Sequence, residues 1–329
     1  MRAVVISELS GPDAVRVVDL AEPTRSHMLT DDEPVVIDVV AAGVSFPDVL
    51  QSRGLYQLKP DLPFVPGAEV AGIVSRAPAG GRFSPGDRVA AFTLLGGMAE
   101  RATAPEFLTF ALPAQLDFAA GAALVVNYHT AYFALKLRGR VCEGEQVLVH
   151  GAAGGVGTAA IQMARALGAL PIAVVSTDEK ERVARDAGAE HVVRSDAAWR
   201  EQVLEISGGG VDVVLDPVGG ERFTDSLRSL REGGRVVVVG FTGGSIPEVR
   251  VNRLLLRNVE VVGAGWGAYA LRRPDFTREV GDAVAELIDA GFLRPVVGAR
   301  FPLEQAASAM RLIDERGATG KVVLAVRDL

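Results

Sequence analysis

The residues with the clearest chemical potential form a glycine-rich loop that ends in Ala153-Gly154-Gly155-Val156-Gly157. It follows a short apolar run at 146–149 and precedes a segment of helical periodicity that stops near Gly168. Small residues let a backbone approach a pyrophosphate closely, and a helix N-terminus offers it unpaired N–H groups and partial positive charge. The strand before the glycines and the helix after them therefore predict a dinucleotide phosphate loop. The alternative is a tight strand-to-helix turn without a ligand.

The residues after the next apolar run, 172–175, indicate which dinucleotide this loop would bind. NAD-binding folds place an acidic residue there, about 20 residues past the glycines, to bind the ribose 2′-hydroxyl. This chain instead has Ser176 and Thr177, with Lys180 one helical turn further on. Hydroxyls and cations suit the dianionic 2′-phosphate of NADPH. The alternative for Lys180 is a solvated lysine on a helix surface.

Two further residues of the same character, Arg194 and Ser195, follow the third apolar run. Because consecutive strands of such folds are neighbours in the sheet, we expect them near the same 2′-phosphate. Asp178 and Glu179 would repel a phosphate, and we interpret them as first-turn residues that the helix dipole favours. NADPH is thus the predicted cofactor.

These motifs must be positioned by a folded domain. The sequence pattern changes at about residue 123, where such a domain begins. From 124 to 265 a pattern of strand, turn and helix repeats, with short apolar runs typical of a parallel sheet buried on both faces. The runs are 146–149, 172–175, 192–193, 211–215, 236–239 and 259–262. We predict an α/β, doubly wound Rossmann sheet.

The flanking segments predict a second domain. Residues 1–123 alternate short β-branched runs with Gly and Pro, which indicates an irregular β-rich domain. Residues 266–329 contain two helical patterns and two short apolar runs, too little to fold alone. We therefore expect the tail to complete the domain formed by 1–123, with the Rossmann domain of 124–265 inserted between them.

Composition excludes several classes of partner. The 34 Lys and Arg against 41 Asp and Glu give a net charge of −7, which argues against nucleic acid or an anionic membrane as the main partner. The sequence has no run of about 18 apolar residues and no apolar signal core at its start, so we expect a cytoplasmic protein without a membrane span. A single cysteine, Cys142, excludes an intramolecular disulfide and any multi-cysteine metal site.

Taken together, the motifs resemble the zinc-independent medium-chain dehydrogenase/reductase superfamily, in particular its quinone oxidoreductase (zeta-crystallin-like) family. The resemblance covers nearly the whole chain. It is carried by Gly144 to Arg165 and by 41–48 (AAGVSFPD), 54–56 (GLY), 66–72 (PGAEVAG), 127–132 (NYHTAY), 216–220 (DPVGG) and 318–324 (ATGKVVL). It implies a GroES-like domain, a Rossmann domain, NADPH, and a homodimer formed through the Rossmann sheets.

Zinc-dependent members of the superfamily carry Cys and His as catalytic metal ligands. At the corresponding positions this chain has Ser45 and Ala68. A hydroxyl and a methyl group do not make a zinc shell, so we predict no metal. Quinone reductases often have Asn where Ser45 stands, and the shorter Ser leaves open the cofactor contact that the resemblance implies for this position.

The resemblance also implies roles for individual residues. Tyr56 matches a family residue that faces the nicotinamide, either as a proton donor or as a packing residue. Asn127 and Thr130 begin a predicted helix and would hydrogen-bond the nicotinamide amide, with helix capping as the alternative. The remaining cofactor-binding positions that the resemblance implies are Gly240, Phe241 and Arg316.

The predicted reaction is hydride transfer from NADPH to a small electrophilic acceptor, because without a metal the acceptor must itself be electron-poor. Quinones meet this requirement, and we expect an NADPH:quinone oxidoreductase (EC 1.6.5.-). Two alternatives stay open from sequence. One is reduction of activated C=C bonds in enals, enones or enoyl thioesters, and the other is a non-catalytic NADPH-binding protein.

Overall fold

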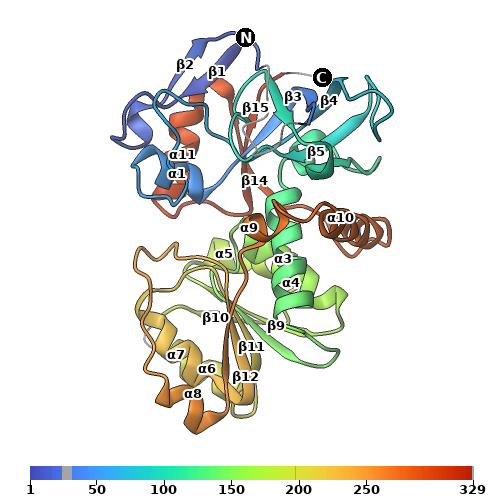
Figure 1. Ribbon diagram of the computed structural model, residues 1–329. Coiled ribbons are helices and arrows are strands. Elements are labelled where there is room, and N and C mark those ends of the chain that lie inside the picture. The colour runs from blue at the N-terminus through green and yellow to red at the C-terminus, as the bar shows by residue number, and fades with distance from the viewer. Residues whose placement is uncertain (24–31, 197, 328–329) are drawn as a thin grey trace. The chain divides into compact units, whose positions relative to one another are not determined.

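The computed structural model describes residues 1–23, 32–196 and 198–327. They form two compact units (Figure 1). Unit 1 comprises Met1–Val126, Ala270–Asp282 and Pro295–Leu329, and unit 2 comprises Asn127–Tyr269 and Ala283–Arg294. The predicted tail, 266–329, thus contributes residues 266–269 and Ala283–Arg294 to unit 2 and most of its length to unit 1.

Unit 2 is built on a six-stranded parallel sheet with the order β10-β9-β8-β11-β12-β13. The strands are β8 (Gln146–Val149), β9 (Leu170–Val175), β10 (His191–Arg194), β11 (Val211–Asp216), β12 (Leu230–Val238) and β13 (Glu260–Gly263). The strand order reverses beside β8, so the switch point lies between β8 and β11, where such folds bind nucleotides. The predicted doubly wound sheet is confirmed.

Helices cover both faces of this sheet, with α6, α7 and α8 on one side and α3 and α4 on the other (Figure 1). The bounds are α3 (Thr130–Tyr132), α4 (Gly155–Ala166), α5 (Asp178–Asp186), α6 (Trp199–Ile206), α7 (Phe223–Arg228) and α8 (Asn252–Arg257). Helix α3 is flanked by π-helical turns at Val125–His129 and Phe133–Arg138, a wider winding that the sequence pattern did not predict. Such turns are rare and occur often at functional sites.

Unit 1 contains a seven-stranded sheet with the order β14-β15-β3-β4-β5-β7, in which β6 also pairs with β3. Its strands are β3 (Val35–Val44), β4 (Glu69–Arg76), β5 (Arg88–Phe92), β6 (Arg101–Ala104), β7 (Thr109–Ala111), β14 (Val297–Pro302) and β15 (Lys321–Ala325). A two-stranded sheet joins β1 (Arg2–Val5) to β2 (Arg16–Asp19). The C-terminal strand β15 pairs antiparallel with β3, so the tail completes the N-terminal sheet.

Helices of unit 1 lie at the ends of these strands. They are α1 (Phe46–Ser52), α2 (Phe118–Gly121) and α11 (Ala306–Asp314). Two more helices, α9 (Trp266–Ala270) and α10 (Pro274–Asp289), run across the boundaries of the two units. In the described residues, no helix combines the length and the apolar character that crossing a membrane requires.

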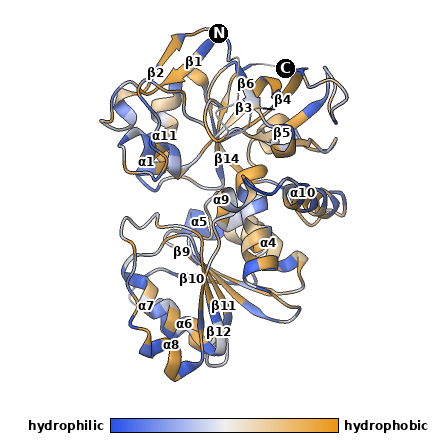
Figure 2. Ribbon diagram, viewed as in Figure 1, coloured by the Kyte–Doolittle hydropathy of each residue, from blue (hydrophilic) through white to orange (hydrophobic). Residues whose placement is uncertain are grey.

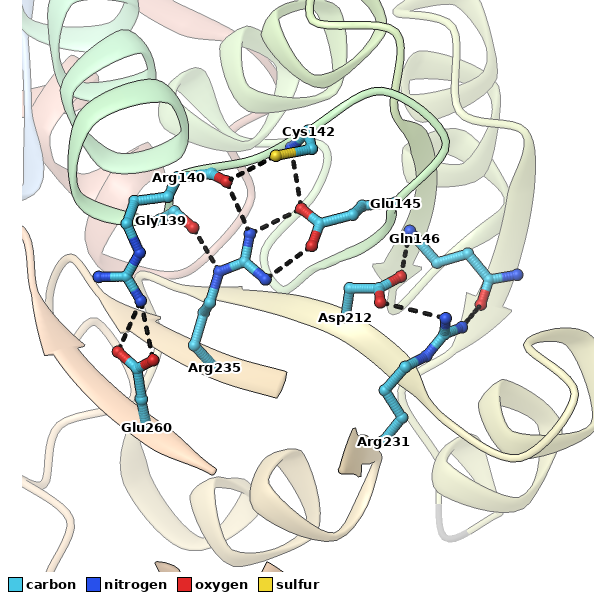
Figure 3. A network of polar contacts seen from close by, with 9 residues as sticks. All are labelled: Gly139, Arg140, Cys142, Glu145, Gln146, Asp212, Arg231, Arg235 and Glu260. Carbon is cyan, nitrogen blue, oxygen red and sulfur yellow. Dashed lines mark hydrogen bonds and ion pairs between the residues drawn. The ribbon is translucent and has the colours of Figure 1, made fainter. Parts of the chain in front are cut away.

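A network of ion pairs and hydrogen bonds closes the N-terminal edge of the unit 2 sheet (Figure 3). Arg235 on β12 is 7% exposed, and its two terminal nitrogens bind the carboxylate of Glu145 at 2.8 and 2.6 Å. The same guanidinium donates to the carbonyl oxygens of Gly139 and Arg140. Beside it, Arg231 forms an ion pair with Asp212 at 3.1 Å. The network ties β8, β11 and β12 together at the edge opposite the glycine loop.

Candidate functional site

The glycine loop has the local geometry of a phosphate cradle. Gly151 has a φ of +58°, a left-handed conformation that favours glycine, and it turns the chain out of β8. A Cβ on Gly157 would lie 2.2 Å from the carbonyl oxygen of Gly151, so only glycine permits this close turn. Gly154 is the N-cap of the 12-residue helix α4 and has no side chain to cap it. The first N–H groups of α4 are therefore open to an anion.

Asn127 lies beside this helix start, and Thr130 belongs to the same unit 2. A Cβ on Gly155 would meet the Asn127 amide nitrogen at 2.7 Å, so the absence of a side chain at Gly155 makes room for the amide. Asn127 is 4% exposed and Thr130 8% exposed. Asn127 belongs to the π-helical turn, and Thr130 is the first residue of α3, for which no side-chain cap is formed. The structure thus gives the amide a place against the phosphate loop.

A pocket follows the ends of β9 and β10, and four predicted cofactor residues line it together. Its lining is Ser176, Thr177, Asp178, Arg194, Ser195 and Asp196. Its one cation, Arg194, is already paired, because Nη2 donates to Asp178 and, at 2.9 Å, to Glu181. A bound anion would therefore have to share the guanidinium with these carboxylates.

The predicted hydroxyls and Lys180 also have local partners. The Thr177 hydroxyl caps α5 by accepting a hydrogen bond from the Lys180 backbone N–H at 3.2 Å. Lys180 Nζ lies 3.4 Å from Ser176 Oγ, so the ammonium reaches the rim of the pocket. Ser176 is exposed and Lys180 is partly exposed on unit 2, where a ligand phosphate could bind them.

The segment with Gly240 and Phe241 follows β12 at the same edge of the sheet. The backbone N–H and hydroxyl of Thr242 both donate to the Pro217 carbonyl oxygen at 3.1 Å. Asp216, at the end of β11, accepts hydrogen bonds from Val218 and Gly219 N–H groups at 2.8 Å. Burial raises the pKa of Asp216. These contacts hold the two loops after β11 and β12 against each other and leave Phe241 37% exposed.

A cluster of charges is buried in unit 1, beside Ser45. Lys321 Nζ donates to Ser45 Oγ at 2.6 Å and forms an ion pair with Glu69. The Lys321 side chain is 3% exposed and that of Glu69 is fully buried. The second oxygen of Glu69 accepts a hydrogen bond from the Val126 N–H at 2.9 Å. Two charges are thus removed from water and joined to one partly exposed hydroxyl.

The strand register explains how residues so distant in sequence meet. Ser45 directly follows β3, whereas Glu69 and Lys321 begin the two antiparallel neighbours of β3, β4 and β15. All three therefore lie at one edge of the sheet. Gly43 makes the room, because a Cβ there would approach Glu69 Cγ and Lys321 Cε at 2.7 Å each.

Asp48 and Tyr56 complete the polar surroundings of Ser45. Asp48 accepts hydrogen bonds from the Ser45 N–H at 2.7 Å and the Gly67 N–H at 3.0 Å, and it forms a capping box with Ser45 at the start of α1. Burial raises the pKa of Asp48 to about 6, against the lowering effect of its backbone hydrogen bonds and of Lys321. Burial and the Asp48 charge also raise the pKa of the Tyr56 phenol, which therefore stays protonated near neutral pH.

Ala68 immediately precedes Glu69 in the sequence and offers no metal ligand. Among residues 1–23, 32–196 and 198–327, no three His, Cys, Asp or Glu side chains converge as a metal site would require. Arg316 belongs to unit 1, where it follows α11 with a φ of +59°. The glycine loop and the pocket belong to unit 2.

Most of the predicted cofactor residues thus gather in unit 2, at the C-terminal ends of its strands. Sequence reasoning assigned no role to Glu69 and Lys321, although both stand in segments that carried the resemblance. The signal was available in part, since each is a charged residue that opens an otherwise apolar strand. Their pairing depends on the register of β3 with its two neighbours, which the local pattern does not contain.

Comparison with protein families identifies the class to which these two units belong. An alcohol dehydrogenase GroES-like domain matches residues 31–114, and a zinc-binding dehydrogenase domain matches residues 155–286. The chain is therefore an oxidoreductase of the medium-chain dehydrogenase/reductase class.

Individual relatives narrow this class. The chain is 38% identical over 331 residues to quinone oxidoreductase-like protein 2 of Bos taurus, covering 99% of this chain and 93% of the relative. It is 34% identical to the quinone oxidoreductase of Homo sapiens, with 98% and 97% covered. The quinone oxidoreductase of Thermus thermophilus, solved also in complex with NADPH, is 37% identical with a TM-score of 0.85, and 99% and 100% of the two chains are covered. This chain belongs to the zinc-independent quinone oxidoreductase family.

Proposed function

We propose that the protein is an NADPH-dependent oxidoreductase that transfers hydride to quinones. The observation that carries the cofactor assignment is the pocket after β9 and β10, where Ser176, Thr177, Arg194 and Ser195 stand in place of the acid that binds an NAD ribose. The glycine loop would hold the pyrophosphate at the start of α4, and Asn127 would bind the nicotinamide end. The NADPH complex of the Thermus relative supports this assignment.

The acceptor class follows from the residues of unit 1. NADPH, when bound, supplies a hydride. Ser45 and Ala68 offer no ligand set that could bind a metal to acidify an alcohol, so the acceptor must be electron-poor in its own right. Tyr56 stays protonated near neutral pH, so it could donate a proton to a reduced acceptor or pack over the nicotinamide. The names of the relatives favour a quinone.

The cofactor assignment is tested by titrating NADPH and NADH into the protein and following cofactor fluorescence. NADPH should bind more tightly, and Lys180→Ala should weaken NADPH by about 1–3 kcal/mol with little change for NADH. A matched control is Lys59→Ala, which removes an exposed lysine of unit 1. Equal affinities of the unaltered protein for both cofactors would contradict the assignment.

The acceptor assignment is tested by following NADPH oxidation with a small panel. Benzoquinone and naphthoquinone should be reduced, and simple primary alcohols should not be oxidised with NADP⁺. Reduction of enones without any quinone would replace the proposal by reduction of activated C=C bonds. Binding of NADPH with no acceptor reduced would favour a non-catalytic role, and NADP⁺-dependent alcohol oxidation would contradict all three.

We further propose a homodimer formed through unit 2. Strand β13 lies at the edge of the sheet with Val261 38% exposed, so its edge can pair with a second copy. The adjoining helix α8 has a hydrophobic surface (Figure 2), where Leu255 and Leu256 are 75% and 77% exposed. Exposed apolar surface of this kind marks protein interfaces. Sedimentation should give twice the monomer mass, and Leu255→Glu should shift it to the monomer.

Two assignments complete the proposal. We propose that residues 124–265 act as the NADPH-binding domain, and that 1–123 with 266–329 act as the catalytic domain. We also propose that the protein works in the cytoplasm, which fractionation of expressing cells would test.

A further inference from the structure

In the Ser45–Lys321–Glu69 cluster, the chemistry of the groups decides which atom donates and which accepts each hydrogen bond. An ammonium group carries three donors and no acceptor, so in the 2.6 Å contact Lys321 donates and Ser45 Oγ accepts. The hydroxyl proton of Ser45 must then point away from Lys321. In the part of the chain that the structure describes, no group accepts it, and Ser45 remains partly exposed. The hydroxyl can thus donate a hydrogen bond to a ligand.

We infer that Ser45, oriented by Lys321 and Glu69, donates a hydrogen bond to an oxygen atom of the acceptor. The inference rests on the proposed function, because it names the group that binds the acceptor in the proposed reaction. Ser45 would be the catalytic residue, and Lys321 and Glu69 would be positioning residues that act through it.

The energetics of the pair favour this role over a purely structural one. A buried ion pair adds little to stability compared with apolar residues of the same volume, because each charge must be stripped of water. Lys321 and Glu69 nevertheless both lie in the interior, and Gly43 is left without a side chain to accommodate them. Besides the Val126 N–H that Glu69 accepts, the group that the pair engages is the Ser45 hydroxyl.

The chemistry of a quinone matches such a donor. When a hydride adds to the ring, negative charge develops on a carbonyl oxygen. A hydrogen bond from a hydroxyl that itself accepts from an ammonium is strengthened by polarisation. A fixed donor that costs no reorganisation stabilises developing charge more in the transition state than in the ground state. The backbone of Ser45 is fixed as well, because its N–H binds Asp48 at 2.7 Å.

The kinetic test compares Ser45→Ala with variants of its partners. Ser45→Ala should lower kcat with benzoquinone by about 10²–10³-fold, the usual effect of removing one such donor, and should leave the affinity for NADPH unchanged. Ser45→Thr keeps a hydroxyl and should retain most of the turnover. The matched control is Ser52→Ala, which removes a buried hydroxyl from the same helix that binds only the Val49 carbonyl oxygen.

The positioning role needs a variant that folds. Lys321→Met alone leaves the Glu69 charge buried without a partner, so the double variant Lys321→Met with Glu69→Gln is used beside it. It should lose turnover to the same order as Ser45→Ala. Adding Ser45→Ala to it should lower kcat no further, because all three residues act through one hydrogen bond. Circular dichroism and thermal unfolding establish that each variant is folded.

A second measurement needs neither cofactor nor turnover. A phenolate carries the same oxygen charge as the hydroquinone monoanion that hydride transfer to a quinone gives, so 4-nitrophenol is titrated by its absorbance with the full-length protein. A donor at the oxygen should raise the acid dissociation constant of the bound phenol about tenfold. The effect should vanish in Ser45→Ala and in the double variant, and it should persist in Ser52→Ala.

The outcomes separate this inference from the function on which it rests. A protein that binds no NADPH or reduces no quinone overturns the proposed function. A protein that reduces quinones equally fast with Ser45→Ala, or that shifts the phenol titration equally in that variant, overturns only the inference. Weaker NADPH binding by Ser45→Ala with an unchanged acceptor step would assign Ser45 to the cofactor and would overturn it too.

Discussion

Among the residues that the structure describes, each unit has an ion pair with a buried cation, and the two pairs differ in what surrounds that cation. In unit 2, Arg235 binds Glu145, and its other donors go to the carbonyl oxygens of Gly139 and Arg140 (Figure 3). In unit 1, Lys321 binds Glu69 and a single hydroxyl. The first cation is surrounded by groups that cannot change partner. The second holds a side chain that can still donate to a ligand.

The difference teaches how a structural ion pair can be told from one at a candidate site. Both cations are buried, so burial of the cation alone does not separate the two pairs. A guanidinium bound to a carboxylate and two backbone carbonyls holds three segments of the chain together. Its loss should therefore lower the free energy of unfolding. Loss of an ammonium that orients a catalytic hydroxyl should instead lower kcat.

The largest expected effect on stability comes from Arg235→Leu. It leaves the Glu145 carboxylate without its countercharge and removes a donor from the Gly139 and Arg140 carbonyl oxygens, which costs about 3–5 kcal/mol for a buried pair. We expect the lower end, because the Glu145 side chain is 21% exposed. Denaturant unfolding measures the loss, and kcat of the folded protein with benzoquinone should not change.

The control for this prediction is the double variant Arg235→Leu with Glu145→Leu, which removes both charges. It should recover part of the stability, because no unpaired charge stays in the interior. Arg235→Leu could instead lower kcat as strongly as the double variant Lys321→Met with Glu69→Gln. That result would contradict the distinction between a structural ion pair in unit 2 and an ion pair that acts on catalysis in unit 1.

The next effect concerns His150, which is buried without a countercharge. Ser226 Oγ donates to the Arg222 carbonyl oxygen at 3.2 Å and so accepts from His150 Nε2 at 2.9 Å, which leaves Nδ1 unprotonated. Burial and Arg222 lower the pKa of His150 to about 3 from 6.5. Between these values the unfolded chain binds a proton that the folded chain does not. The unfolding free energy therefore falls as the pH falls below 6.5.

The size of this effect is about 3 kcal/mol between pH 7 and pH 4 for His150 alone. His129, whose pKa burial also lowers to about 3, should add a similar amount. His150→Gln keeps a polar side chain and cannot titrate, so its unfolding free energy should depend less on pH by about 3 kcal/mol. Chemical unfolding at the two pH values checks it. Identical pH dependence of the variant and the unaltered protein would contradict the assignment.

The sequence predicted the strands and pocket residues of unit 2, but it did not predict the two ion pairs. The strands of unit 2 follow from local apolar runs, and Ser176, Thr177, Arg194 and Ser195 were each predicted from their place after a strand. The structure brings these four to one pocket, and their role in binding NADPH stays a prediction. These four residues could be predicted from the sequence because parallel strands end at one edge of the sheet whatever their register.

The charged cluster of unit 1 could not be predicted from the sequence in this way. Glu69 and Lys321 are 252 residues apart, and they meet only because β4 and β15 flank β3 in a register that brings both over Gly43. A shift of that register by one residue would turn them to opposite faces. The Arg235 network was missed for the same reason, because its carbonyl partners come from the irregular segment before β8.

A third ion pair, at the cofactor pocket, gives an intermediate case. Arg194 is paired with Asp178 and Glu181, but Asp178 is 98% exposed, so the guanidinium can exchange partners. Arg194→Met should weaken NADPH by about 2 kcal/mol, the value of a charge-assisted hydrogen bond, and should leave NADH unaffected. Asp178→Asn should tighten NADPH by about threefold, because one competitor for the guanidinium is removed. Fluorescence titration measures both, and a loss of NADH affinity equal to that of NADPH would show that Arg194 does not bind the 2′-phosphate.

The smallest effect should come from the exposed ion pair at the edge of the Figure 3 network. Arg140 contacts both oxygens of Glu260 through Nη2 alone, at 2.8 and 2.7 Å, whereas Arg235 uses two nitrogens, and the Arg140 side chain is 56% exposed. Arg140 also has a φ of +53°, which disfavours any side chain. Arg140→Gly removes the ion pair and this backbone penalty together, and it keeps the carbonyl oxygen that Arg235 and Cys142 bind. Water and salt weaken the lost pair, and the gain in backbone freedom of the unfolded chain offsets the relief at φ. The midpoint of thermal unfolding should therefore stay within about 2 °C of the unaltered protein. A fall of more than about 5 °C would mean that solvent exposure does not reduce the contribution of this ion pair to stability.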